Sequence, residues 1–173
     1  VPINVLAHIE LRPALPERLH GLAGGNGGRG LKVWMRTRGL PPGSLAAGRG
    51  HGLHWIYADR ELSGGDVLAL GFGYEDGGFD PTSAEAVGEA LGALWPEAQL
   101  TGHTLHDWNG DEFSRGTWLT EIAGRPLPPV DDALADRRLV LAGSDVSPRE
   151  AGWIEGALLS GAEAAADILE RLR

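Results

Sequence analysis

The sequence predicts a mixed fold, α+β or α/β, in which a mixed β-sheet with helices is joined to a second structural unit. Several strand-like segments come before one amphipathic helix, as expected of a sheet that packs against a helix. A separate strand–turn–helix pattern closes the chain after a proline-rich stretch. The 173 residues, 42% of them apolar, are enough to build a sizeable core.

The elements of the first unit are predicted from their composition and bounding residues. The glycine-rich stretch 21–30 is expected to form a flexible loop before the first strand. A helix is expected over residues 84–94, because Thr82 or Ser83 can cap its first turn and Pro96 helps to end it. Strands are expected where apolar and aromatic residues run between turn residues. They are residues 31–37, 52–62, 66–75 and 100–108.

The closing unit is predicted as a strand over Leu139–Leu141, a turn of small residues, and a helix that opens at residues 153–156. Gly152, Gly156 and Ser160 are spaced by four residues, which predicts a line of small residues along that helix. Such a line sacrifices helix propensity, so something is expected to pack closely on it. Two explanations are open, a tightly packed neighbouring sheet and a bound group that approaches the bare backbone.

Composition excludes several classes of function. A net charge of −9 argues against a nucleic-acid surface, which needs clustered Lys and Arg. No apolar run approaches 18 residues, so no membrane-spanning helix is expected. The chain has no cysteine, which removes disulfides, thiolate zinc sites and cysteine nucleophiles. The two H-x-x-H pairs, at 51–54 and 103–106, place their members on opposite strand faces, so no metal site is predicted.

Four segments together resemble a known family. The segment AGSDVSPREAGWIEGALLSGAEAA resembles the C-terminal flavin motif of the flavin-containing amine oxidases, which include monoamine oxidases, polyamine oxidases and L-amino-acid oxidases. VPINVLAHIELRPALP resembles the segment that leads into their substrate domain, and GRGLKVWM resembles the strand that carries a flavin-facing lysine. HDWNGDEFSRGTW resembles the stretch with the first aromatic residue of the substrate cage. The resemblance runs in order along nearly the whole chain.

The resemblance implies a domain organisation. Residues 1–10 would end a segment of the FAD domain, residues 11–130 would form part of the substrate-binding domain, and residues 131–173 would be the C-terminal strand and helix of an FAD-binding Rossmann-like domain. The family's G-x-G-x-x-G fingerprint, which binds the FAD pyrophosphate, is absent from its expected context. We therefore expect the N-terminal part of that domain to be missing here and to be supplied by a partner chain.

The resemblance also implies a set of FAD-binding residues at the closing turn and helix. The helix N-terminus would face the flavin ring, where its free N–H groups favour negative charge. Gly152 would let the backbone approach the ring closely, and Asp145 would hydrogen-bond the ribityl chain. The full set of residues implied to bind the cofactor is Gly143, Ser144, Asp145, Gly152, Trp153, Ile154 and Ala157.

Three residues are implied to act in catalysis. Trp118 and Trp153 match the two cage aromatics that flank the amine, although most relatives have Tyr at one or both positions. Lys32 matches the lysine that holds a water against flavin N5, and it is the single lysine among 15 cationic residues. A surface lysine at a strand edge is the alternative for Lys32. The other four tryptophans, Trp34, Trp55, Trp95 and Trp108, are expected in the core.

Alternatives stay open for the roles of two arginines and for the function of the protein. Arg115 and Arg149 flank the cage positions and could bind a substrate carboxylate, but salt bridges are the favoured expectation. The function implied by the resemblance is FAD-dependent oxidation of a small amine to an imine, with O2 reoxidation giving H2O2, in the cytoplasm. An L-amino-acid oxidase is the alternative enzyme, and a non-catalytic binding or assembly module is the alternative from another class.

Overall fold

The computed structural model describes residues 2–12, 14–17, 19–20, 28–49, 51–75, 77–120 and 139–173. The chain divides into two compact units. We call Arg29–Asp107 the sheet unit, and Val1–Gly28 with Trp108–Arg173 the terminal unit. Most of the predicted glycine-rich loop, the proline-rich stretch and the predicted domain boundary at residue 131 lie outside the described residues.

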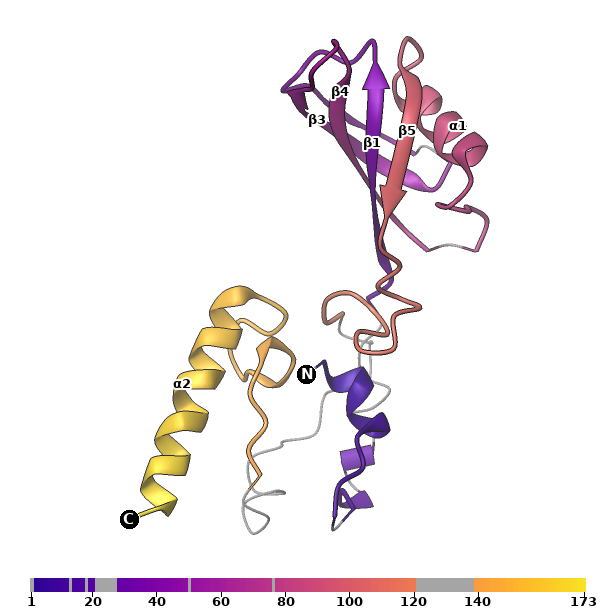
Figure 1. The fold of residues 1–173 in the computed structure, drawn as a ribbon. Coiled ribbons are helices and arrows are strands. Elements are labelled where there is room, and N and C mark those ends of the chain that lie inside the picture. Colours follow the sequence, from indigo (N-terminus) through magenta and orange to yellow (C-terminus); the bar gives the residue numbers. More distant parts are fainter. Residues whose placement is uncertain are drawn as a thin grey trace. The chain divides into compact units, whose positions relative to one another are not determined.

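The sheet unit contains one antiparallel five-stranded sheet with the strand order β2-β3-β4-β1-β5 (Figure 1). Four strands confirm the sequence prediction to within a few residues, although the fourth ends at Leu105 instead of Trp108. The short strand β2 was not predicted. The strands are β1 (Gly30–Arg38), β2 (Leu45–Ala47), β3 (Leu53–Glu61), β4 (Val67–Tyr74) and β5 (Gln99–Leu105).

One face of the sheet is covered by helix α1 (Ala84–Leu94), whose bounds agree with the prediction (Figure 1). The Ser83 hydroxyl accepts a hydrogen bond from the Ala86 N–H, so Ser83 is the N-cap. Apolar side chains of α1 and of alternate strand positions form the core between them. Its fully buried members include Val33, Met35, Leu53, Ile56, Ala69, Val87, Ala90 and Leu91.

The buried carboxylate of Asp66 binds two arginines of β1 at one end of the sheet. Asp66, just before β4, accepts hydrogen bonds from the Nε groups of Arg36 and Arg38. The Thr37 hydroxyl, which is fully buried, donates to the Val67 carbonyl oxygen at 3.1 Å. Hydrogen bonding from Arg38, with a further contribution from Arg36, lowers the pKa of Asp66 below its ordinary value of 3.8 against the opposing effect of desolvation.

The described part of the terminal unit includes the 3-10 helices η1 (Ile3–His8) and η5 (Ser144–Val146) and the long helix α2 (Ile154–Arg171). Leu6 and Leu19 form a small buried cluster, and Leu139 and Leu141 pack against it. Among the described residues, no helix has the length and hydrophobicity that crossing a bilayer demands.

The prediction of a closing strand over Leu139–Leu141 is wrong. Residues 139–142 carry no strand assignment, and no strand of the described part of the terminal unit lies beside them. A strand exists only when a neighbour accepts and donates its ladder hydrogen bonds. Leu139 and Leu141 instead pack as partly buried side chains against the cluster of Leu6 and Leu19.

Candidate functional site in the terminal unit and on the sheet

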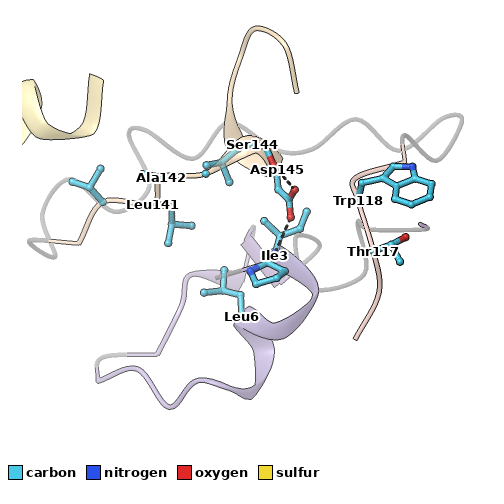
Figure 2. A pocket seen from close by; sticks show the side chains of 12 residues that line it. Ile3, Leu6, Thr117, Trp118, Leu141, Ala142, Ser144 and Asp145 are labelled. Atoms are coloured by element: carbon cyan, nitrogen blue, oxygen red, sulfur yellow. Dashed lines mark hydrogen bonds between the residues drawn. The ribbon is translucent and has the colours of Figure 1, made fainter. Parts of the chain in front are cut away.

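A pocket of about 470 Å³ lies in the terminal unit, between η1 and the turn that contains η5 (Figure 2). One side is apolar and comes from Ile3 and Leu6, and the other side contains the predicted cofactor-binding residues Gly143, Ser144 and Asp145. The remaining lining residues are Pro2, Thr117, Trp118, Val140, Leu141, Ala142 and Val146.

Asp145 holds the two sides of this pocket together. Its Oδ2 accepts a hydrogen bond from the Ile3 N–H at 3.2 Å, and its Oδ1 accepts one from the Ser144 hydroxyl at 3.2 Å (Figure 2). The sequence analysis missed Ile3 because a backbone donor leaves no trace in the side-chain pattern. A carboxylate that is fixed at the pocket wall can receive a further hydroxyl donor, because each oxygen has two lone pairs.

Only part of the predicted line of small residues lies on helix α2. Gly152 is not in the helix: it has a φ of 80°, a left-handed conformation that only glycine adopts without strain, and α2 begins two residues later. Gly156 and Ser160 are buried against their own turn. A Cβ on Gly156 would lie 2.2 Å from the Glu150 carbonyl oxygen, and the Ser160 hydroxyl accepts a hydrogen bond from the Gly143 N–H at 3.2 Å.

The start of α2 is open. Trp153 is the N-cap residue, and its side chain makes no capping hydrogen bond. The first N–H groups of a helix have no intrahelical acceptor, so they favour a negatively charged group. Trp153 and Ile154 are exposed by 70% and 83%, which is unusual for side chains of this size. An uncapped helix with bare apolar side chains at its entrance fits a flat, electron-accepting ring.

The two proposed cage residues come from neighbouring segments. A Cβ on Gly152 would lie 3.4 Å from the Leu119 carbonyl oxygen, so the turn before Trp153 contacts the residue after Trp118. Trp118 lines the pocket, whereas Trp153 does not. No ring contact joins the two indoles within the described part of the chain. Their roles as cage walls stay a prediction.

Lys32 belongs to the sheet unit. It lies on β1 with its side chain on the face of the sheet opposite α1, as the alternation of Leu31, Lys32 and Val33 predicted. Across the sheet, Lys32 is paired with Phe72, and Phe72 with Trp55. Among the described residues, the Lys32 ammonium makes no hydrogen bond or ion pair, in contrast to Arg36 on the same strand.

The open face of the sheet carries an aromatic cluster that the sequence analysis missed. The rings of Trp55 and Phe72 are stacked with centroids 4.8 Å apart, and Phe72 meets Tyr74 edge to face at 5.5 Å. Trp34 and Tyr57 lie in the adjacent row and are exposed by 41% and 40%. Alternation of these aromatics with buried residues along β1, β3 and β4 was the sequence pattern that could have identified the face.

The prediction of four core tryptophans is therefore wrong in part. Trp95 packs against the core, and Trp55 is half-buried on the open face. Trp34 and Trp108 are exposed, because Trp34 shares the uncovered face with Lys32 and Trp108 follows the end of β5. A helix covers only one face of this sheet, so alternate aromatic positions on its strands cannot all be in the core.

The two arginines have different surroundings. Arg149 forms an ion pair with Glu163 of α2 at 3.0 Å, which agrees with the favoured salt-bridge expectation. The Arg115 backbone is left-handed, with a φ of 49°, and its carbonyl oxygen accepts a hydrogen bond from the Asn4 amide at 2.6 Å. Asn4 also donates to the Ser114 carbonyl oxygen at 2.9 Å. In the sequence, the signal for these contacts was a polar residue, Asn4, inside an otherwise apolar N-terminal run.

The chain belongs to the flavin-containing amine oxidoreductase family, whose model matches residues 1–169. It is 36% identical over 160 residues to (S)-6-hydroxynicotine oxidase from Paenarthrobacter nicotinovorans, covering 91% of this chain and 37% of that protein. It is 29% identical over 180 residues to pseudooxynicotine dehydrogenase from a Pseudomonas species, covering 100% of this chain and 36% of that protein. The chain thus spans a little over a third of the length of these relatives.

Solved structures support the same fold. Wild-type putrescine oxidase bound to putrescine aligns with a TM-score of 0.69 and 19% identity, over 98% of this chain and 41% of the other. Cyclohexylamine oxidase from Brevibacterium oxydans aligns with a TM-score of 0.65 and 21% identity, over 99% of this chain and 42% of the other. Both alignments include the sheet and the closing helix.

FAD is the cofactor of this family. The described residues fit such a group at the turn into α2. The helix start is uncapped, the side chains of Trp153 and Ile154 are bare, and the pocket beside Asp145 has hydrogen-bonding groups on its wall. The predicted set from Gly143 to Ala157 lies on the η5 turn and the first turn of α2, and the individual role of each residue stays a prediction.

Proposed function

We propose that this chain is the C-terminal part of an FAD-dependent amine oxidase whose substrate carries a flat aromatic or heteroaromatic ring. The observation that carries the proposal is Lys32: the single lysine of the chain is unpaired among the described residues and is the cross-strand neighbour of Phe72, whose ring stacks on Trp55. A cation on a solvated surface has no need of such surroundings, and a non-catalytic module has no need of the lysine.

The roles of the chain's own residues follow from their chemistry. When bound, FAD would supply the two-electron chemistry, taking a hydride equivalent from the α-carbon of the amine and passing electrons to O2 to give H2O2. The imine would hydrolyse in water. Lys32 would hold a proton-donating water and stabilise negative charge. Trp118 and Trp153 would orient the amine and exclude bulkier groups.

The aromatic cluster supports the ring-bearing substrate. Trp55 and Phe72 offer a wide face of the kind on which a planar ring stacks, at an energy of about 0.5–1.5 kcal/mol per pair. Three relatives have names that specify nicotine or a derivative: the two described above, and nicotine dehydrogenase from Pseudomonas putida at 27% identity. Each of those names contains a pyridine-bearing amine, which agrees with the chemistry of this face.

The test measures amine-dependent H2O2 release by this chain together with the N-terminal FAD-binding part that the proposal requires. Pyridine- and phenyl-bearing amines should be turned over faster than putrescine or leucine. Lys32→Met should slow turnover by roughly 100-fold while flavin stays bound, because a positioned proton-transfer group is lost. Arg49→Met removes a cation from an exposed position and serves as the control. Wild-type rates of flavin reduction and reoxidation in Lys32→Met would refute the proposed role of the lysine.

A further inference from the structure

A buried asparagine interrupts the apolar start of the terminal unit. Asn4 lies on η1 among buried apolar residues, and it is itself only 9% exposed. Its amide nitrogen donates hydrogen bonds to two consecutive carbonyl oxygens, that of Ser114 at 2.9 Å and that of Arg115 at 2.6 Å. Carbonyl oxygens only accept hydrogen bonds, so the nitrogen of the amide must face them. An apolar residue of similar size would fill the same space without making these bonds.

Packing alone does not explain the side chain of Asn4. Its oxygen, Oδ1, is buried and accepts no hydrogen bond from any residue that the structure describes. A buried acceptor without a donor destabilises a fold, so an apolar side chain would serve the stability of η1 at least as well. The amide is therefore better explained by the segment that it holds than by the free energy of unfolding.

The segment that Asn4 holds has an unusual backbone at the point of contact. Arg115 has a φ of 49°, a left-handed conformation that is uncommon for a residue with a side chain. Its N–H donates to the Asp111 carbonyl oxygen at 2.8 Å, and its own carbonyl oxygen accepts from Asn4. Both sides of this residue are thus held by hydrogen bonds. Trp118, the predicted cage residue, comes shortly after, so the direction in which the chain leaves this turn sets the position of its indole.

Ile3 and Asn4 are consecutive and bind two different segments of the pocket wall. The Ile3 N–H donates to Asp145 Oδ2 at 3.2 Å, on the turn predicted to bind FAD (Figure 2). Asn4 binds the segment that carries Trp118, and both Trp118 and Asp145 line the pocket. All of these contacts lie within the terminal unit. One turn of η1 therefore fixes both segments against the same piece of backbone.

We infer that Asn4 is a positioning residue for amine oxidation, which holds the predicted cage wall Trp118 in place relative to the turn that carries Asp145. The inference rests on the proposed function. In this role Asn4 acts through the backbone of the loop and touches neither amine nor flavin. A wall that is held in place orients the amine, and loss of the amide would misplace the wall while the cofactor stays bound.

The experiment compares two variants and one control in the flavin-loaded protein, which contains this chain and the N-terminal FAD-binding part. Asn4→Leu removes the amide at nearly equal volume, and Asn4→Ala covers the case in which leucine does not fit. Val5→Ala weakens packing at the next buried position but keeps the amide, so it is the control. Trypsin cleavage after Arg115 reports on the loop, and cleavage after the exposed Arg149 reports on the rest of the terminal unit.

Both Asn4 variants should be cleaved after Arg115 about tenfold faster than wild type, with cleavage after Arg149 unchanged, because only the loop has lost its hydrogen bonds. Their kcat/KM for the amine should fall about tenfold at unchanged flavin content, since the amine is less well oriented. Val5→Ala should show neither the selective cleavage nor the selective loss of kcat/KM.

Three results would overturn the inference. They are unchanged cleavage after Arg115 in both Asn4 variants, equal acceleration after Arg115 and Arg149, and selective cleavage of the loop at wild-type kcat/KM. Equal acceleration would show that Asn4 serves only the fold. A wild-type protein without amine-dependent H2O2 release would refute the proposed function, and selective cleavage after Arg115 would still establish that Asn4 holds the loop.

Discussion

The side chain of Trp153 contributes little buried surface to the terminal unit. Trp153 caps α2 with its backbone alone, its indole is exposed by 70%, and its carbonyl oxygen accepts a hydrogen bond from the Ala157 N–H at 3.2 Å. A tryptophan at such a position is expected to add little to the stability of this unit, because few of its atoms are buried. The proposed role as a cage wall would account for its size.

Trp153→Ala should therefore leave the melting temperature nearly unchanged and weaken amine turnover in the flavin-loaded complex. Loss of an aromatic wall removes about 1–3 kcal/mol of burial and orientation. Steady-state kinetics and flavin content per complex check this result. Trp108→Ala, at an exposed tryptophan outside the pocket, is the control. A drop in flavin content at unchanged turnover per bound flavin would show that Trp153 serves only the cofactor or the fold.

Substitutions of two glycines of α2 are expected to have opposite effects on the free energy of unfolding. Gly156→Ala places a Cβ against the Glu150 carbonyl, so the helix must move from its turn at a cost of about 1–3 kcal/mol. Gly161→Ala meets no atom within 4 Å and should stabilise the helix by about 0.5–1 kcal/mol. Urea titrations of the two variants and the wild type measure the difference. A stable Gly156→Ala protein would mean that the contact with Glu150 is not maintained.

At the scale of elements, the sheet unit and helix α2 (Ile154–Arg171) were predictable, whereas the closing strand was not. Strand β1 and helix α1 follow from alternation and from the Ser83 cap, which are local patterns. Residues 139–141 have the composition of a strand but lack a neighbour, and pairing is decided by other parts of the protein. Gly152 was assigned to the helix because spacing does not reveal a left-handed φ.

The candidate site could likewise be predicted only in part from the sequence. The family motif predicted the segment from Gly143 to Ala157 as cofactor-binding because its residues lie close together in the sequence. The aromatic pair Trp55 and Phe72 comes together only through the register of β3 and β4, which no local pattern specifies. The contact between Ile3 and Asp145 joins residues 142 positions apart by a backbone donor, so it could not be predicted from side chains.

The buried Asp66 predicts how the sheet unit responds to acid. Hydrogen bonds from Arg38 and Arg36 lower the pKa of Asp66 in the folded protein. Its stabilising effect is therefore present above the unfolded pKa and is lost as the pH falls below about 4. Asp66→Asn should lower the melting temperature at pH 7 and reduce its fall between pH 5 and 2. Asp59→Asn, which breaks a pair with Arg60 on the surface, is the control. Parallel acid profiles for wild type and Asp66→Asn would contradict this prediction.

At the scale of the whole molecule, the two units differ in the size of their buried apolar cores. The sheet unit has a continuous core of twelve buried residues, whereas the buried cluster described in the terminal unit contains only Leu6 and Leu19. Strand β1 lies between β4 and β5, so both of its edges are hydrogen-bonded. Stability is therefore expected to be distributed unevenly along the chain.

Hydrogen exchange of the isolated chain should reflect this difference. Amides of β1 and β4 should exchange at least about 100-fold more slowly than those of α2, because α2 is covered on one side only. Mass spectrometry of the chain after exchange in D2O measures both rates. Uniform protection across the chain would contradict this prediction.

The exposed leucines of α2 affect how the isolated polypeptide behaves in solution. Leu158, Leu169 and Leu172 are exposed by 65%, 62% and 78%. Exposed apolar side chains on successive turns of a helix favour self-association, because contact removes them from water. Sulfate and phosphate salts strengthen apolar burial, so they should promote self-association of the isolated polypeptide.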